Sequence, residues 1–264
     1  MMVLQRKDYD RYKGYFPQIA GKEKGWQMLS CCFDSPFSQE QSPASFAVDS
    51  REHPSCAAVM MGDFRFFFGK PQAGFLQEAV GERTNQLVIA PDHRWLALAE
   101  EIFEDALRYQ RQRFRFYRNA QVLNKLRHLS QHLPEGTRLE AIDRCWFEQS
   151  RHHTWMYDFC SQFTDYESYR RHGLGFLLTR DGKPLSGASS YLVSNTGFTI
   201  QVQTAEDQMQ RGYALHTAAA LIYAGVQRGK YPDWDADNPI SAHLAQKLGY
   251  LPEEQYPTVL VQRF

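Results

Sequence analysis

The feature that most constrains the fold of this chain is a strand-like run followed by a glycine-containing turn and a long alanine-rich helix. The run covers residues 198–204, with the sequence Phe-Thr-Ile-Gln-Val-Gln-Thr, and the turn covers residues 205–214. The start of a helix presents backbone N–H groups that lack intrahelical partners, and the helix dipole adds partial positive charge there. This arrangement predicts an anion-binding site that suits a pyrophosphate.

The composition of the turn supports this prediction. Gly212 and Ala214 are small where the backbone must approach a ligand closely, and Arg211 places a cation beside the helix start. No Lys-Ser or Lys-Thr pair follows Gly212, so the turn is not a nucleoside-triphosphate P-loop, and the later glycines of a dinucleotide fingerprint are missing. An ordinary helix start is the alternative, because strand–turn–helix units are common in α/β domains.

Two predicted helices flank a short predicted strand after this turn. The first helix has apolar residues at helical spacing and Gly229 at its C-terminal cap position. The apolar face of this helix contains Leu215, Ala219, Ile222 and Val226. Residues 231–235 follow as a strand, and a second helix then begins with Asn238 as N-cap and Pro239 at the first helical position.

These paired segments resemble the GNAT superfamily of acyl-CoA-dependent N-acyltransferases. In that family a loop of the form Arg/Gln-x-x-Gly-x-Gly/Ala joins a strand to a helix and holds the CoA pyrophosphate. The matching residues are 209–214, Met-Gln-Arg-Gly-Tyr-Ala, with Met209 where the family has Arg or Gln. Residues 238–250 resemble the second CoA-side helix of the family. With Trp234 and Asp235 before it, this segment is most similar to the zwittermicin-resistance-like branch.

The resemblance implies an N-acetyltransferase that moves an acetyl group from acetyl-CoA to a primary amine of a small molecule or peptide. It implies direct attack by the amine, without a covalent enzyme intermediate and without a metal. A backbone N–H near Val202 would polarise the thioester carbonyl, and the main chain of residues 202–204 would pair with pantetheine. The residues assigned to acetyl-CoA in this way are Val202, Gln203, Thr204, Met209, Gln210, Arg211, Gly212, Tyr213, Ala214, Asn238 and Ser241.

The general base and acid are less clearly marked. Gln201 and Gln203 occupy strand positions where some relatives carry an acid, so the candidate bases are Glu206, Asp235 and Asp237. Many family members use a tyrosine of the second helix as the acid toward the thiolate, and that position is Ala245 here. The candidates to replace it are Tyr250, Ser241 and a water molecule.

The composition limits the class of protein. The 264 residues carry 30 basic and 30 acidic side chains, and a net charge of zero argues against a general attraction to nucleic acid or to an anionic membrane. No apolar run is long enough to span a membrane, and the first residues lack a signal-peptide pattern. The five cysteines are expected to be reduced thiols in a cytoplasm. Without a Cys-x-x-Cys pair a structural zinc site is not expected, and His128 and His132 are expected to be solvated helix residues.

The breaker cluster at residues 133–136, Leu-Pro-Glu-Gly, predicts a boundary. We therefore expect a mixed α/β domain of unknown role at 1–134 and a GNAT-like domain with a mixed α/β (α+β) sheet at 135–264. Expected elements of the second domain are strands at 137–142, 174–179, 186–193 and 258–264 and helices at 144–159 and 166–172. In the first domain we expect a hairpin over 56–69, a strand at 86–90 and a helix at 95–107. The first domain could wall the acceptor site, form a homodimer surface or be a degenerate copy of the same fold.

Residues 108–127 are basic and aromatic and contain no acid. One interpretation is a nucleic-acid platform in which arginines meet phosphates and aromatic rings stack on bases. The neutral charge of the chain favours the other, a half-buried strand with Phe114 and Phe116 inward and Arg113 and Arg115 outward. Three functions therefore stay open: an acetyltransferase, a CoA-binding regulator without turnover, and a nucleic-acid-associated protein. The regulator is suggested by Met209 and Ala245, which differ from the residues of the family pattern.

Overall fold

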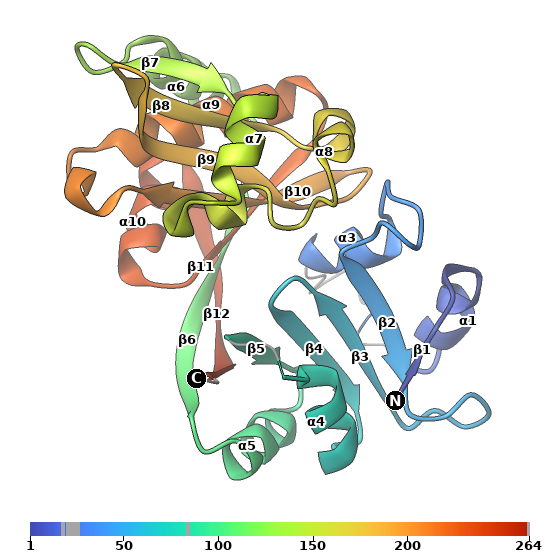
Figure 1. Ribbon diagram of the computed structural model, residues 1–264. Coiled ribbons are helices and arrows are strands. Elements are labelled where there is room, and N and C mark those ends of the chain that lie inside the picture. Colours follow the sequence, from blue (N-terminus) through green and yellow to red (C-terminus); the bar gives the residue numbers. More distant parts are fainter. Residues whose placement is uncertain (17–18, 20–26, 83–84, 263–264) are drawn as a thin grey trace. The chain divides into compact units, whose positions relative to one another are not determined.

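The computed structural model describes residues 1–16, 19, 27–82 and 85–262. Contacts between residues divide the chain into two compact units (Figure 1). Unit 1 contains Met1–Arg111 and Gln255–Phe264, and unit 2 contains Gln112–Glu254. Both units combine a mixed sheet with helices, as expected for a mixed α/β fold.

Unit 1 begins with a short strand and small helices and continues as an antiparallel sheet that ends in a parallel pair. Its described elements are β1 (Met2–Val3), η1 (Arg6–Asp8), α1 (Tyr9–Lys13), η3 (Gln27–Leu29), α3 (Ser30–Phe33), β2 (Ala44–Val48), β3 (Cys56–Met61), β4 (Phe64–Gly69), α4 (Ala73–Val80), β5 (Gln86–Ile89) and α5 (His93–Ile102). The expected hairpin and strand are confirmed, but the expected helix ends at Ile102, because Ala106 and Leu107 already belong to the next strand.

Two strands, β6 (Ala106–Phe116) and β12 (Tyr250–Val261), have residues in both units. The elements between them lie in unit 2 and are α6 (Ala120–Gln131), β7 (Arg138–Ala141), α7 (Arg144–Ser150), η4 (Thr154–Phe159), α8 (Tyr166–His172), β8 (Gly175–Arg180), β9 (Lys183–Val193), β10 (Gly197–Thr204), η5 (Glu206–Gln208), α9 (Tyr213–Gln227), β11 (Tyr231–Ala236) and α10 (Pro239–Lys247). The expected helix at 144–159 is interrupted after Ser150 and continues as a 3-10 helix. The final strand starts at Tyr250, earlier than expected.

The two units repeat one topology. The strand order is β1-β2-β3-β4-β5-β12 in one and β7-β8-β9-β10-β11-β6 in the other. In each unit the fourth and fifth strands are parallel and pair over three residues only, and the last strand is antiparallel to the fifth. The strand that follows α5 completes the sheet of unit 2, and the strand that follows α10 completes that of unit 1. The chain is therefore an internal duplication in which the two units exchange their last strands.

This exchange explains why the units do not follow the boundary expected between residues 134 and 135. Helix α6 lies before that boundary but packs on α9, and the nitrogen Nδ1 of His216 lies 2.8 Å from the carbonyl of Leu129. The residues from Gln112 onward pair with β11. A breaker cluster marks only a turn between elements, whereas unit membership depends on which elements pack together.

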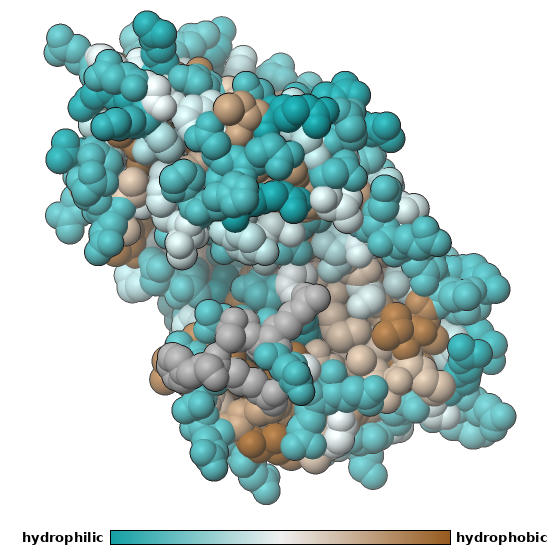
Figure 2. Space-filling view, in the orientation of Figure 1, coloured by the Kyte–Doolittle hydropathy of each residue, from teal (hydrophilic) through white to brown (hydrophobic). Residues whose placement is uncertain are grey.

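Strand β6 contains the alternating arginines and phenylalanines and is half-buried, with its phenylalanines inward. Phe114 and Phe116 are 2% and 6% exposed, while Arg113 and Arg115 form ion pairs with Glu254 and Glu253. Both arginines of this alternation therefore have carboxylate partners within the protein. The visible surface is mainly hydrophilic with scattered apolar side chains (Figure 2).

The faces of the sheet in unit 2 are fixed by residues in contact with helices. On one face Gly225 of α9 packs against Phe198, and the hydroxyl of Thr217 lies 3.5 Å from that of Ser186. On the other face Phe159 of η4 covers Gly187. Since side chains alternate along a strand, α9 and η4 cover opposite faces of β9 and β10.

Replacement by alanine should have opposite effects on stability at the two helical glycines, Gly225 and Gly74. A Cβ at Gly225 would meet the ring of Phe198, whereas a Cβ at Gly74 in α4 meets nothing within 4 Å. Gly225→Ala should therefore lower the free energy of unfolding by about 1–3 kcal/mol. Gly74→Ala should raise it by about 0.5–1 kcal/mol, because alanine favours the helix. Urea unfolding followed by circular dichroism measures both, and destabilisation of similar size at the two positions would contradict this packing.

Candidate functional site

The loop between β10 and α9 carries backbone amides that have no hydrogen-bond partner among the described residues. Gln210 has φ +62° and Gly212 has φ +79°, and α9 begins at the next residue, Tyr213. None of the N–H groups from Gln210 to Ala214 donates a hydrogen bond to a described residue. Left-handed residues beside right-handed ones make successive amides converge into an anion-binding concavity. A helix N-terminus strengthens it.

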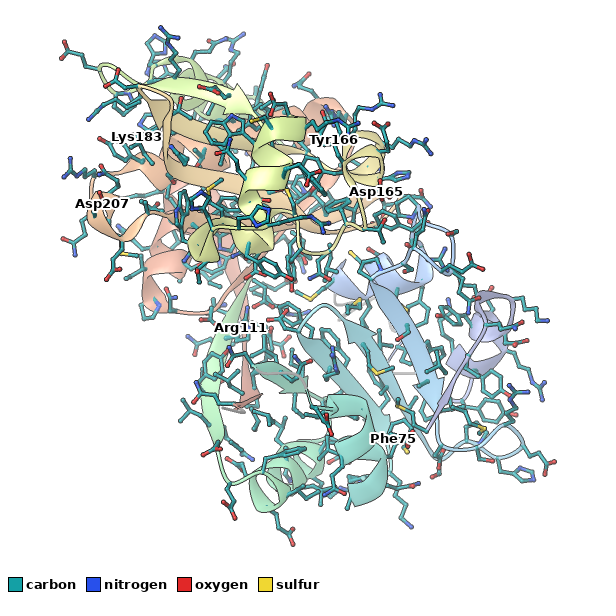
Figure 3. All side chains as sticks on the ribbon, viewed as in Figure 1. Phe75, Arg111, Asp165, Tyr166, Lys183 and Asp207 are labelled. Atoms are coloured by element: carbon teal, nitrogen blue, oxygen red, sulfur yellow. The ribbon has the colours of Figure 1, made fainter. Side chains whose placement is uncertain are left out.

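The side chains around this loop are mostly exposed. Arg211 is exposed, and Arg180 donates from Nη2 to the hydroxyl of Tyr213 at 3.2 Å. Glu206 and Asp207 lie on η5 and are exposed, and Figure 3 shows Asp207 on this loop. A Cβ at Gly212 would meet nothing within 4 Å, so the space in front of the amides is open.

An open strand edge leads away from the loop. β10 pairs in parallel with β11 only at Gly197–Thr199 with Tyr231–Asp233, although both strands continue. On its other side β10 pairs with β9, and Ala205 N–H donates to the Leu185 carbonyl at 3.0 Å. Peptide groups alternate in direction along a strand, so the N–H groups of Val202 and Thr204 point to the open edge.

The start of α10 lies on the other side of this edge. Asn238 caps the helix through Oδ1, which accepts from the Ser241 N–H at 2.9 Å, and Pro239 occupies the first helical position. The hydroxyl of Ser241 accepts from the indole N–H of Trp234 at 3.2 Å. Ile240 beside it is 83% exposed. An uncovered apolar side chain at a helix start is available for contact with a ligand.

Two carboxylates lie on the opposite face of β11. Trp234 points to α10, so its neighbours Asp233 and Asp235 point to the face that η4 covers on β9 and β10. Asp233 is in register with Thr199, the last paired residue of β10, and Asp235 is in register with Arg113 of β6. Burial, and then the charge of Asp235, raises the pKa of Asp233 to about 7, while Arg113 acts in the opposite direction.

The predicted site residues fall into two groups. The structure brings the residues assigned to acetyl-CoA to one open strand edge, the loop after it and the start of α10. The residues considered for acid–base chemistry are dispersed. Glu206 is exposed, Ser241 contacts Trp234, and Tyr250 is 1% exposed with its hydroxyl donating to the Pro232 carbonyl at 2.9 Å. Ala245, where relatives carry tyrosine, is fully buried.

The sequence reasoning did not single out Asp233. The signal was present, because Asp233 and Asp235 alternate with Pro232 and Trp234 in the strand predicted at 231–235. That alternation places the two acids on one face. Their partial burial and the separation of β10 from β11 beside them are visible only in the structure.

The equivalent position in unit 1 is closed. Only residues 70–72 separate β4 from α4, and the N–H of Lys70 donates to the Ser55 carbonyl. Trp95, at the third position of α5 as Ser241 is in α10, is fully buried and donates its indole N–H to the Gly69 carbonyl at 3.1 Å. The indole occupies the end of β4, and the Asp49 carboxylate accepts from Gln72 nearby at 2.8 Å. Unit 1 thus keeps the topology, but Trp95 occupies the end of β4 and the connection to α4 is short.

No described helix is long and apolar enough to cross a membrane. Within the described residues, no group of three or more His, Cys, Asp or Glu side chains could hold a metal ion. His128 and His132 are exposed and stack on each other with ring centroids 3.9 Å apart. All five cysteines are described and carry free thiols.

The raised pKa of Asp233 gives a prediction for stability. The folded state binds this proton up to about pH 7, whereas the unfolded carboxyl has an ordinary pKa of 3.8. The folded state therefore loses stability as the pH rises from 3.8 through 7. Asp233→Asn should raise the free energy of unfolding at pH 8 by at least about 1 kcal/mol and much less at pH 4. Urea unfolding at the two pH values measures the difference, and an equal effect at both would contradict a raised pKa.

Comparison with known proteins identifies proteins of similar sequence and fold. The chain is similar to a GCN5-related N-acetyltransferase-like protein from Streptococcus suis, with a TM-score of 0.82, 29% identity, and coverage of 94% of this chain and 98% of that one. It also resembles in fold a tandem GNAT protein from the clavulanic acid biosynthesis pathway, with a TM-score of 0.53, 13% identity, and coverage of 100% and 98%. No curated protein matches significantly. The model of the GNAT acetyltransferase family matches residues 35–259, so the chain belongs to the GNAT acetyltransferase family.

Proposed function

We propose that unit 2 binds acetyl-CoA and transfers its acetyl group to a primary amine by direct attack. The observation that carries this proposal is the continuity of the open edge of β10 with the loop that follows it. An extended thiol-ended chain can add to the edge as a strand would, while its phosphates meet the free amides at the start of α9.

Each part of this surface then has a role. The amides from Gln210 to Ala214 bind the pyrophosphate, and Arg211 adds an exposed cation. The N–H of Val202 donates to the thioester carbonyl and stabilises the oxyanion that develops there. Thr204 pairs with the pantetheine amides. Asn238 and Ser241 contact the pantetheine arm from α10.

Two exposed apolar side chains support the same assignment. Met209, at the first position of the loop, is 52% exposed, and Ile240 of α10 is 83% exposed. Exposed apolar side chains on the loop and at the start of α10 are available for contact with apolar parts of a ligand. Met209 cannot donate a hydrogen bond to phosphate as the family's Arg or Gln would. In this proposal it contacts apolar parts of CoA, and Arg211 supplies the charge.

The amine enters from the face opposite α9 and α10, where Asp233 and Asp235 lie. The narrower similarity to the zwittermicin-resistance-like branch makes amine-bearing antibiotics one acceptor class, beside polyamines, amino acids and peptide N-termini. We expect a cytoplasmic location, in keeping with five free thiols. A CoA-binding regulator without turnover is the second candidate, because Ala245 offers no hydroxyl to the leaving thiolate.

The proposed function predicts binding of acetyl-CoA and of free CoA, but not of ATP, by isothermal titration. We expect one CoA per chain, because the equivalent position in unit 1 is filled by Trp95. Thiol release from acetyl-CoA in the presence of the amine classes above then measures turnover. Binding without turnover on any amine would favour the regulator, and no binding would leave the loop as an ordinary helix start.

A matched pair of variants at Gly212 tests the loop itself. Gly212→Gln and Gly212→Glu impose the same strain of a positive φ and similar bulk, but only Glu adds a negative charge in front of the amides. We expect Gly212→Glu to weaken CoA binding at least about tenfold more than Gly212→Gln, a difference near 1.4 kcal/mol. Titration calorimetry measures both, and circular dichroism confirms folding. Equal affinities of the two variants would remove the loop from the binding site.

A further inference from the structure

One carboxylate of unit 2 stands at the point where β10 and β11 separate. Asp233 is in register with Thr199, the last residue of β10 that pairs with β11. From Ile200 onward the edge of β10 is open, and the Val202 N–H points to it. Asp233 therefore borders the closed end of the gap between the strands. In the proposed function, that is the end that receives the acetyl group.

The side chain of Asp233 lies on the face from which an acceptor would approach. Trp234 next to it contacts Ser241 on the opposite face, where α9 and α10 pack. On the acceptor face β10 contributes the uncharged Gln201 and Gln203, which are in register with Ser189 and Gly187 under η4. No other carboxylate of β10 or β11 besides Asp235 shares this face among the described residues.

The charged groups around Asp233 come from three strands. Asp235 follows it on β11, and β6 contributes Arg113 and Arg115, which are paired with Glu254 and Glu253 of β12. Tyr231, on the same face, has its hydroxyl accepting from the Phe116 N–H at 3.0 Å. Tyr250 lies behind the strand with its hydroxyl bonded to Pro232. The nearest like charge is thus that of Asp235, and the nearest cation already has a carboxylate partner.

The other acids that the sequence suggested fit this task less well. Glu206 lies on the exposed turn η5 beyond the end of β10, and Asp237 lies beyond the end of β11 and is exposed. A base for an ammonium must reach the nitrogen and keep a basicity near the working pH. Burial and the charge of Asp235 raise the pKa of Asp233 to about 7, which meets the second condition, and its place at the gap meets the first.

We propose that Asp233 is the catalytic base that takes a proton from the acceptor ammonium, and that Asp235 is a positioning residue that keeps Asp233 basic. This proposal rests on the proposed function of unit 2. The Asp233 carboxylate accepts one proton from the ammonium, and the amine lone pair forms a C–N bond to the thioester carbon. The C–S bond then breaks, and CoA leaves as a thiolate. The second proton of the nitrogen passes to this thiolate, and Asp233 returns its own proton to solvent.

The test compares Asp233→Asn with Asp235→Asn, using acetyl-CoA and an amine that the protein turns over. Asp233→Asn should lower kcat by at least about 100-fold and leave the Kd for CoA within about threefold. In the parent protein kcat/KM should fall as the pH drops below about 7, because the protonated base is inactive. This acid limb should be lost in Asp233→Asn. An unchanged acid limb, or a kcat within threefold of the parent, would overturn the assignment.

The variant Asp235→Asn tests the positioning role of Asp235 through the pH profile, which a purely structural residue would not shift. Removing a like charge should lower the pKa of Asp233, so the acid limb should move to lower pH while CoA binding stays unchanged. A large loss of kcat in Asp235→Asn together with a mild effect in Asp233→Asn would instead identify Asp235 as the base. That outcome would overturn the proposal.

A second measurement separates this proposal from the function on which it rests. Carbon-13 NMR of labelled aspartate in the CoA-bound protein reports the titration of the Asp233 carboxyl, which Asp233→Asn identifies by the loss of its signal. If CoA binds and no amine is acetylated, the proposed acetyltransferase function is wrong, whatever the pKa of Asp233. A carboxyl signal that titrates near pH 4, with or without turnover, would overturn the role of Asp233.

Discussion

The candidate site depends on one constraint of the sheet in unit 2, namely that β10 and β11 remain paired for only three residues. Parallel strands that stayed paired along their whole length would satisfy each other's peptide groups and leave no edge. Because they part after Thr199 and Asp233, the amides of Val202 and Thr204 are left for a ligand. The same separation puts the loop amides of α9 and the start of α10 on the two sides of one opening. In the proposed function, binding and chemistry both use this interruption of the strand pairing.

The sheet around this opening is packed on both faces. Gly225 lets α9 approach Phe198 of β10, and Gly187 lets η4 approach β9. On the far side of β11, Arg113 and Arg115 join β6 to β12 through Glu254 and Glu253. β11 is therefore held by β6 where it is free of β10, as its register with Gln112–Phe114 shows.

Comparison of the two units indicates which features, besides the shared topology, an open ligand-binding edge requires. Unit 1 has the same strand order and the same three-residue parallel pairing, yet Trp95 fills the end of β4 and the connection to α4 is short. In unit 2 the corresponding helix position is Ser241, and residues 205–212 form the loop. One side chain and one loop thus distinguish an open edge from a filled one within a single chain.

Much of the local structure follows from the sequence itself. The helix start after Gly212, the Asn238–Pro239 cap and the alternation of Phe114 and Phe116 with arginines depend on neighbouring residues, and the structure confirms them. The loop pattern was also sufficient to indicate the family. The tertiary structure decided what depends on distant residues. It paired residues 112–114 of β6 with β11 of unit 2, and it buried Tyr250. It also brought Asp233 and Asp235 to the point where β10 and β11 separate. Strand exchange and burial join segments far apart in the chain, and no local pattern of residues encodes them.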